Sequence, residues 1–160
     1  MRIGGHGLRD HIRLLAPLLV LIAAVWALRL VLYAAGAPSF VLHIVSVTLA
    51  GAACTLLAAI MINSRRFGSY TNVVAAVFLL SCWQQLLISA AIVFTALTGL
   101  PNVYSAPEFS FGQSLWAHIA GHLTFGIGSG TILGAVMGCA VLWILRKADR
   151  MQGRHAVSGR

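Results

Sequence analysis

The chain has 160 residues, of which 59% are hydrophobic and only 9% are charged, and its mean hydropathy is +0.90. Soluble domains carry charge on about a quarter of their residues, so this composition excludes an ordinary soluble domain and indicates a protein that lies in the lipid bilayer. A formal net charge of +8 would also suit a nucleic-acid partner, but the Lys and Arg residues lie at the ends of apolar runs and form no basic stripe, which excludes nucleic acid.

Four apolar segments are long enough to cross a bilayer as helices, which takes about 20 residues each. The breaks between them contain the Gly, Pro, Asn and Ser residues that commonly end helices. We place the spans at about 12–35, 40–62, 70–97 and 114–145. The sequence therefore predicts an all-α integral membrane protein in which four transmembrane helices form one compact bundle, as a single domain.

The Lys and Arg residues predict the orientation of this bundle. They lie before the first span, in the second loop at Arg65 and Arg66, and in the tail 146–160, whereas the first and third loops have none. Under the positive-inside rule both termini are cytoplasmic, which predicts a multi-pass protein of the cytoplasmic (inner) membrane. In an alternative, the first span is a cleaved secretory signal and the other spans keep their orientation. The glycines before the first span predict a mobile lead segment.

Ionisable residues gather toward the outer side of the predicted bundle. A helix rises about 1.5 Å per residue, so Arg29 in the first span, His43 in the second, and His118 and His122 in the fourth lie at similar depth in the membrane. The acidic residue Glu108 lies in the outer loop. Intramembrane ionisable groups commonly face a bundle interior and are candidates for function. The candidate polar cluster comprises Arg29, His43, Glu108, His118 and His122.

His118 and His122 are four residues apart, so both imidazoles project from one side of a helix. Three interpretations stay open. The favoured one has the histidines bonding to neighbouring helices or interfacial water. The second is a haem or metal-ion site in which His43 joins His118 and His122 as a ligand. The third is a site for a proton or a quinone-type small molecule.

Two adjacent amides lie near the middle of the third span, where water is scarcest. Neighbouring residues of a helix point about 100° apart, so at most one of Gln84 and Gln85 lies squarely on a narrow helix interface. We expect them to form interhelical hydrogen bonds.

A series of glycines in the fourth span forms three overlapping GxxxG motifs: Gly126, Gly130, Gly134 and Gly138. Small residues at this spacing let helix backbones approach closely in lipid. The series predicts a helix-packing ridge, either within the bundle or between protomers. Each step of four residues advances about 40° around an ideal helix, so we expect the ridge to wind and the two histidines to meet a different neighbour.

These patterns favour a non-enzymatic accessory or packing subunit that associates through the glycine ridge, as a homo-oligomer or in a larger membrane complex. The first alternative is a redox protein that binds haem or a metal ion through the outer histidines. The second is a subunit of a small-molecule transporter or channel.

Overall fold

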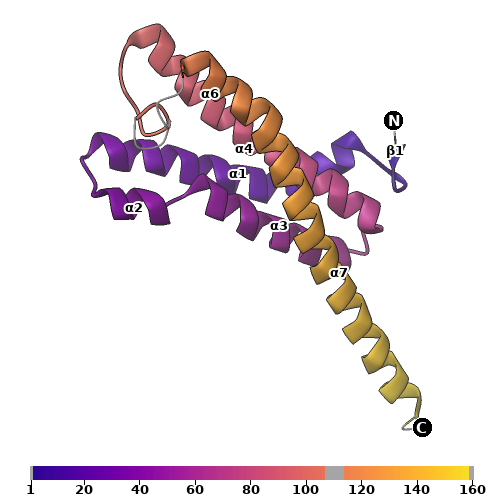
Figure 1. Ribbon diagram of the computed structural model, residues 1–160. Helices are drawn as coiled ribbons and strands as arrows, with labels where there is room; N and C mark the ends of the chain where they lie inside the picture. Colours follow the sequence, from indigo (N-terminus) through magenta and orange to yellow (C-terminus); the bar gives the residue numbers. More distant parts are fainter. Residues whose placement is uncertain (1, 107–113, 159–160) are drawn as a thin grey trace.

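The computed structural model describes the backbone of residues 2–106 and 114–158 and the side chains of residues 3–106 and 114–151. Within this part of the chain, four helical segments are long and apolar enough to cross a membrane: Leu8–Ala34, Ser39–Ser64, Tyr70–Thr98 and Leu115–Met151 (Figure 1). The described part of the chain is mostly helical and has four segments of spanning length, so this part of the prediction is confirmed. Glu108 lies outside the described residues.

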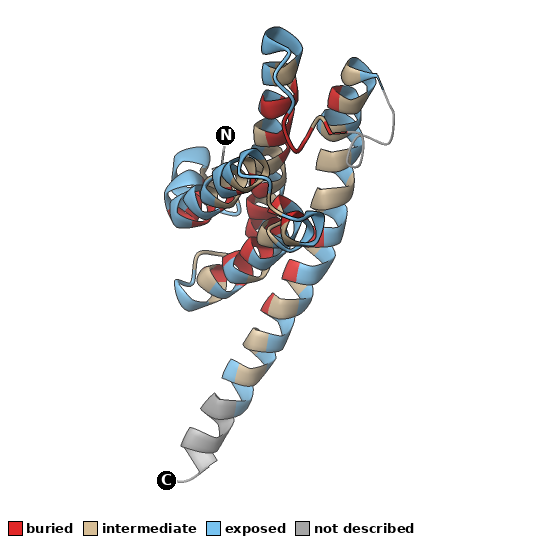
Figure 2. Ribbon diagram, turned by 90° about the vertical axis from the view of Figure 1, so that its left-hand side faces the viewer, coloured by how far each residue is buried: buried red, intermediate tan, exposed pale blue. Residues whose placement is uncertain are grey.

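The four segments contain six α-helices and one π-helical turn, and a short hairpin precedes them. The helices are α1 (Leu8–Ala34), α2 (Ser39–Ile44), α3 (Val47–Ser64), α4 (Tyr70–Thr98), α6 (Leu115–Gly121) and α7 (Ile127–Ser158); the π-helical turn η1 is His122–Gly126; the strands are β1 (Arg2–Ile3) and β2 (His6–Gly7). α4 lies at the centre and packs against α1, α3 and α7. Buried side chains concentrate between these helices, while much of α7 is exposed (Figure 2).

The first helix ends in a glycine-dependent cap. Gly36 has a φ of 73°, which an L side chain rarely adopts, and its N–H bonds to the carbonyl of Tyr33 while Ala37 bonds to Leu32. This Schellman arrangement satisfies the last carbonyls of α1. The short connection that follows brings α2 back beside the end of α1.

The second span, predicted as one helix over about 40–62, is broken into α2 and α3. Ser46 has an extended backbone at the break, and its hydroxyl accepts a hydrogen bond from the Thr48 N–H, 3.2 Å away, so that it caps α3. Such a cap competes with helix continuation because the side chain replaces a backbone acceptor. The prediction of an unbroken helix was wrong at this position.

The segment before the first span forms an antiparallel hairpin in which Arg2 pairs with Gly7 and Ile3 pairs with His6. Gly4 and Gly5 both have positive φ, as two-residue hairpin turns require. The His6 ring stacks on Phe67, with 3.9 Å between ring centroids. The expectation of a mobile lead was therefore wrong, because the glycines shape a turn that packs against the loop between α3 and α4.

Asn72 fastens this hairpin to the bundle. Its amide donates to the carbonyls of Phe67 and Gly4, and its Oδ1 accepts from Nε2 of His11, 3.1 Å away. Both Asn72 and His11 are almost wholly buried. This hydrogen-bond network joins the turn between β1 and β2 to α1 and α4 at the basic end of the molecule.

The glycine series of the fourth span faces α4 along its whole length. A Cβ added to Gly126, Gly130, Gly134 or Gly138 would lie within 3.1 Å of a side chain at every fourth position of α4: Gln85, Ser81, Val77 and Val73. The ridge is thus occupied by another helix of the same chain. Dispersion contacts along closely approaching backbones stabilise such pairs in lipid.

The fourth span does not wind as an ideal helix would. In η1 the N–H of Ile127 bonds to the carbonyl of His122, five residues earlier, and this wider turn absorbs the drift that steps of four residues accumulate. As a result His122 faces the same neighbour, α4, as the glycines do. The expectation that the histidines meet a different neighbour was wrong for His122. The helix also continues past residue 145 into the basic tail, beyond the other helices (Figure 1).

Candidate functional site

Four of the five residues predicted as a polar cluster line one cavity near the ends of α1, α3 and α6. The cavity has a volume of about 240 Å³ and is lined by Arg29, His43, Ser46, Thr48, Ile88, Tyr104, His118 and His122. Counting residues along each span predicts only that these side chains lie at a common depth in the membrane. The structure shows that they also lie around the same cavity. We call this space the outer cavity.

The two histidines of the fourth span are hydrogen-bonded to each other and to α4. Nδ1 of His122 lies 2.7 Å from Oε1 of Gln85, and Nε2 of His122 lies 3.0 Å from Nε2 of His118. Because an amide oxygen only accepts, Nδ1 of His122 must donate, and the neutral His122 ring then has its lone pair at Nε2. His118 therefore donates to His122, and the chain of donors runs from the cavity toward α4.

Gln85 fixes which nitrogen of His122 carries the proton and holds the orientation of the ring. Histidines that act as metal ligands or as bases are commonly held by a hydrogen bond of this kind. It is itself buried, with 8% of its surface exposed. The predicted interhelical role of the central amides is thus observed for Gln85, which bonds to a side chain of the fourth span.

Arg29 brings a permanent positive charge to the outer cavity. It is 8% exposed, and its Nε donates to the Leu42 carbonyl of α2, 3.1 Å away. That carbonyl lies in the short helix α2, just before the break in the second span. The guanidinium also lies over the Tyr104 ring, 5.1 Å from its centroid, which is within cation–π range.

The outer loop positions Tyr104 above Arg29. Asn102 holds this loop, because its amide donates to the Ala91 carbonyl at 2.6 Å and to the Thr95 hydroxyl at 2.7 Å, while its Oδ1 accepts from the Tyr104 N–H at 2.9 Å. Burial raises the pKa of Tyr104 to about 12, and the nearby Arg29 charge only partly offsets this effect. The phenol is therefore a neutral hydrogen-bonding group at ordinary pH.

The chemistry of the outer cavity favours an electron-rich ligand over a cation. Its described lining contains a guanidinium, imidazoles, hydroxyls and a phenol, but no carboxylate. Among the described residues, no three His, Cys, Asp or Glu side chains converge to hold a metal ion. His43, the third predicted metal ligand, donates through Nδ1 to the Ser39 carbonyl, 2.7 Å away.

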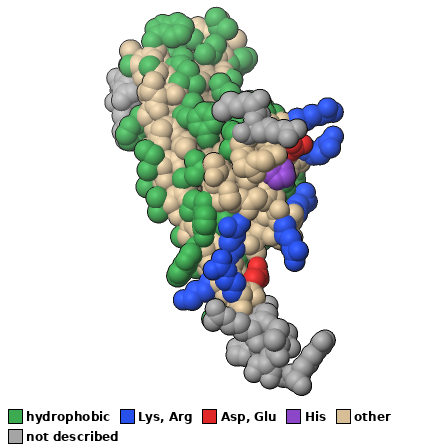
Figure 3. Space-filling view, turned by 90° about the vertical axis from the view of Figure 1, so that its right-hand side faces the viewer, with side chains coloured by type: hydrophobic (Ala, Val, Ile, Leu, Met, Phe, Trp, Pro, Cys, Tyr) green, Lys and Arg blue, Asp and Glu red, His purple; other side chains and the backbone are tan. Residues whose placement is uncertain are grey.

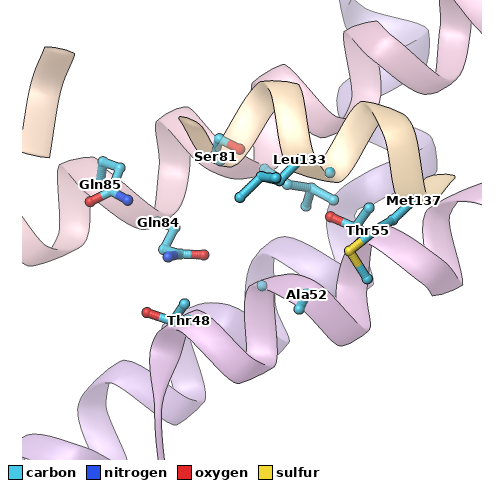
Figure 4. A pocket seen from close by; sticks show the side chains of 12 residues that line it. Thr48, Ala52, Thr55, Ser81, Gln84, Gln85, Leu133 and Met137 are labelled. Atoms are coloured by element: carbon cyan, nitrogen blue, oxygen red, sulfur yellow. The ribbon is translucent and has the colours of Figure 1, made fainter. Parts of the chain in front are cut away.

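A second cavity, of about 190 Å³, lies deeper between α3, α4 and α7. Gln84 reaches from α4 toward α3 in this space (Figure 4). Its amide also covers Gly51, where it leaves no room for a Cβ. Gln85 and Thr48 also line this cavity, and Thr48 is shared with the outer cavity. We call it the mid-bundle cavity; it adjoins the outer cavity at Thr48, and its Gln85 bonds to His122 in the lining of the outer cavity.

Sequence reasoning did not identify Tyr104 and Asn102 as parts of the site. Tyr104 lies near the end of a predicted span, where Tyr is typical of the membrane interface. It is buried only because the loop folds back onto the bundle. Asn102 follows a proline in a loop, where Asn is common in turns, so its type alone carried no signal.

No family model, no curated protein and no solved structure matches this chain. The site is therefore interpreted from its own geometry.

Proposed function

We propose that this protein binds a small molecule with an electron-rich oxygen, a carboxylate or a quinone carbonyl, in the outer cavity. The observation that carries this proposal is the convergence of the Arg29 guanidinium, the Tyr104 phenol and the His118 imidazole on one cavity. A permanent positive charge attracts an electron-rich ligand, and in this cavity the charge is the Arg29 guanidinium. Tyr104 and His118 add donors or acceptors beside it, as sites for oriented polar ligands require.

The Lys and Arg distribution supports an orientation with both termini in the cytoplasm. In that orientation the outer cavity faces the external half of the cytoplasmic membrane, and its ligand enters from the outer leaflet or the external solution.

A thermal unfolding series in neutral detergent tests the proposal. The purified protein is titrated with acetate, benzoate and a short-chain benzoquinone, and the unfolding temperature is measured for the wild type, R29Q and R9Q. A ligand at 100 times its dissociation constant stabilises the folded state by about 2.7 kcal/mol. We expect this stabilisation in the wild type and in R9Q, which removes the same charge at the opposite end, and its loss in R29Q.

The outcome separates the two ligand classes, because stabilisation by the acids alone identifies a carboxylate site and stabilisation by the quinone alone identifies a quinone site. No stabilisation by any of the three, or equal stabilisation of R29Q, contradicts the proposal. The haem alternative has its own measurement, a visible absorption spectrum of the purified protein, in which a Soret band would support haem and reject our proposal.

A second candidate function, transport, is favoured by the adjoining mid-bundle cavity. Within its mostly apolar lining, the hydroxyls and the amide of Thr48, Thr55, Ser81 and Gln84 provide hydrogen-bonding groups inward of the outer cavity. If the ligand moves inward, Q84L should abolish its uptake into proteoliposomes while its binding is kept, because Gln84 does not line the outer cavity. If proteoliposomes that contain the wild-type protein take up no ligand, transport is rejected and ligand binding alone is the function.

The glycine ridge offers little to the accessory-subunit hypothesis in this conformation. Since α4 covers all four glycines, a partner subunit would have to displace α4 or use another surface. Oligomerisation through other faces of the bundle is compatible with ligand binding and is measured by mass determination in detergent.

A further inference from the structure

A further pocket lies at the opposite, basic end of the bundle from the outer cavity. It has a volume of about 340 Å³ and is lined by Tyr70, Trp143, Arg146, Lys147 and Arg150. Three cations and two aromatic rings therefore surround one space, where the fourth span passes the start of α4. We call it the basic pocket.

Contacts within the pocket hold its cations in place. The Arg146 guanidinium lies over the Tyr70 ring at 5.2 Å and donates to the Gly68 carbonyl. The Lys147 ammonium lies 5.2 Å from the Trp143 ring centroid. Arg150 follows Arg146 by four residues, so the two project from one side of α7.

The positive charge of the pocket is not neutralised from within its described lining, which contains no carboxylate. The nearest acidic residue in sequence, Asp149, is engaged elsewhere, because its Oδ2 accepts from Nδ2 of Asn63 on α3, 3.1 Å away. Figure 3 shows Lys and Arg side chains gathered at this end, below a surface of hydrophobic side chains. Such a site attracts an anion.

An exposed apolar stripe continues from the pocket along the same side of α7. Trp143, Val136 and Ile132 are 55%, 67% and 67% exposed, and with Ala140 they precede Lys147 at steps of three or four residues, which keeps them on one helix face. A free phosphate ion would make no contact with this apolar surface, whereas the acyl chains of a lipid would cover it. Trp and Tyr at the junction are typical of the interface between headgroups and acyl chains.

We infer that the basic pocket binds the phosphate headgroup of an anionic phospholipid, with the acyl chains along the α7 stripe. Arg146 and Arg150 hold the phosphate, and Lys147 adds charge from the rim. Basic pockets beside membrane helices on the cytoplasmic side are suited to anionic headgroups. This inference is independent of the outer cavity and its ligand.

Native mass spectrometry from neutral detergent tests the inference by counting bound lipids. The protein is titrated with phosphatidylglycerol, with phosphatidylcholine of the same chains, and with inorganic phosphate. The test variant K147Q/R150Q changes two exposed residues and leaves the Arg146 contact to Gly68 intact. The matched control R65Q/R66Q removes two charges from exposed positions at the same end of the bundle. Unfolding temperatures establish that both variants are folded.

We expect one phosphatidylglycerol to be retained by the wild type and by R65Q/R66Q, and its affinity to fall by roughly tenfold to thirtyfold in K147Q/R150Q. Equal losses in both variants would mean general surface charge and would overturn the inference. Equal retention of phosphatidylcholine would overturn it as well. Displacement of the lipid by millimolar inorganic phosphate would show a small-anion site and would also reject a lipid site.

Discussion

The contact between α7 and α4 makes a sharp prediction for Gly134. A Cβ at this position would lie 2.6 Å from Cγ1 of Val77, about 0.8 Å inside the 3.4 Å at which ordinary contact begins. Val77 is fully buried and β-branched, so it has no rotamer to which it can readily move. Overpacking of this kind costs about 1–3 kcal/mol, while Ala in place of Gly gains about 1 kcal/mol of helix propensity. We expect G134A to lower the free energy of unfolding by up to about 2 kcal/mol.

Gly128 provides the matched control in the same helix, since a Cβ there meets nothing within 4 Å. G128A should therefore gain stability, by up to about 1 kcal/mol. Unfolding in mixed micelles of dodecylmaltoside and SDS, followed by circular dichroism, measures both variants. The double variant G134A/V77A should show a favourable coupling of about 0.5–2 kcal/mol, because the smaller side chain restores the space. If G134A is as stable as G128A, the close approach of α7 to α4 is refuted.

Three further predictions concern the segments at the two ends of the bundle. N102A should lower the free energy of unfolding by about 2–3 kcal/mol in thermal unfolding, because it leaves the buried loop N–H of Tyr104 without its acceptor; a change below about 0.5 kcal/mol would contradict the role of Asn102. Because burial raises the pKa of Tyr104 from 10 to about 12, the folded state keeps a proton that the unfolded state loses. Stability should fall by up to about 3 kcal/mol as pH rises from 10 to 12, and Y104F should remove that part of the slope, whereas identical slopes would disprove it. N72A should lower stability by about 2–3 kcal/mol and speed proteolysis of the N-terminal hairpin, because His11 loses its buried partner; unchanged cleavage rates would refute this fastening.

The helices themselves follow from composition, since a run of about 20 apolar residues has few alternatives to a spanning helix. The rotation of each helix about its axis does not follow, because it depends on which side chains interlock. This is why depth counting placed His43, His118 and His122 at one level, while their meeting at one cavity with Arg29 needed the structure.

Departures from regular helix geometry were beyond sequence reasoning for a related reason. The break at Ser46 replaces one backbone hydrogen bond by a side-chain bond, and the two options differ by about 1 kcal/mol. The hairpin at Gly4 and Gly5 is stable only against Phe67 and Asn72, which lie more than sixty positions away in the chain. Where the alternative backbone conformations differ little in free energy and distant contacts decide between them, the local sequence has no pattern that predicts the outcome.

The wide turn η1 amounts to one extra residue inserted between a packing surface and a binding surface. If 122–126 wound as a regular α-helix with the same number of residues, the preceding segment would be rotated by about 100° relative to α7. His118 would then leave the outer cavity, while Gly130, Gly134 and Gly138 would keep their register on α4. The winding of this one turn therefore decides which side chains of the fourth span face the ligand, without any repacking of the helix pair that supports it.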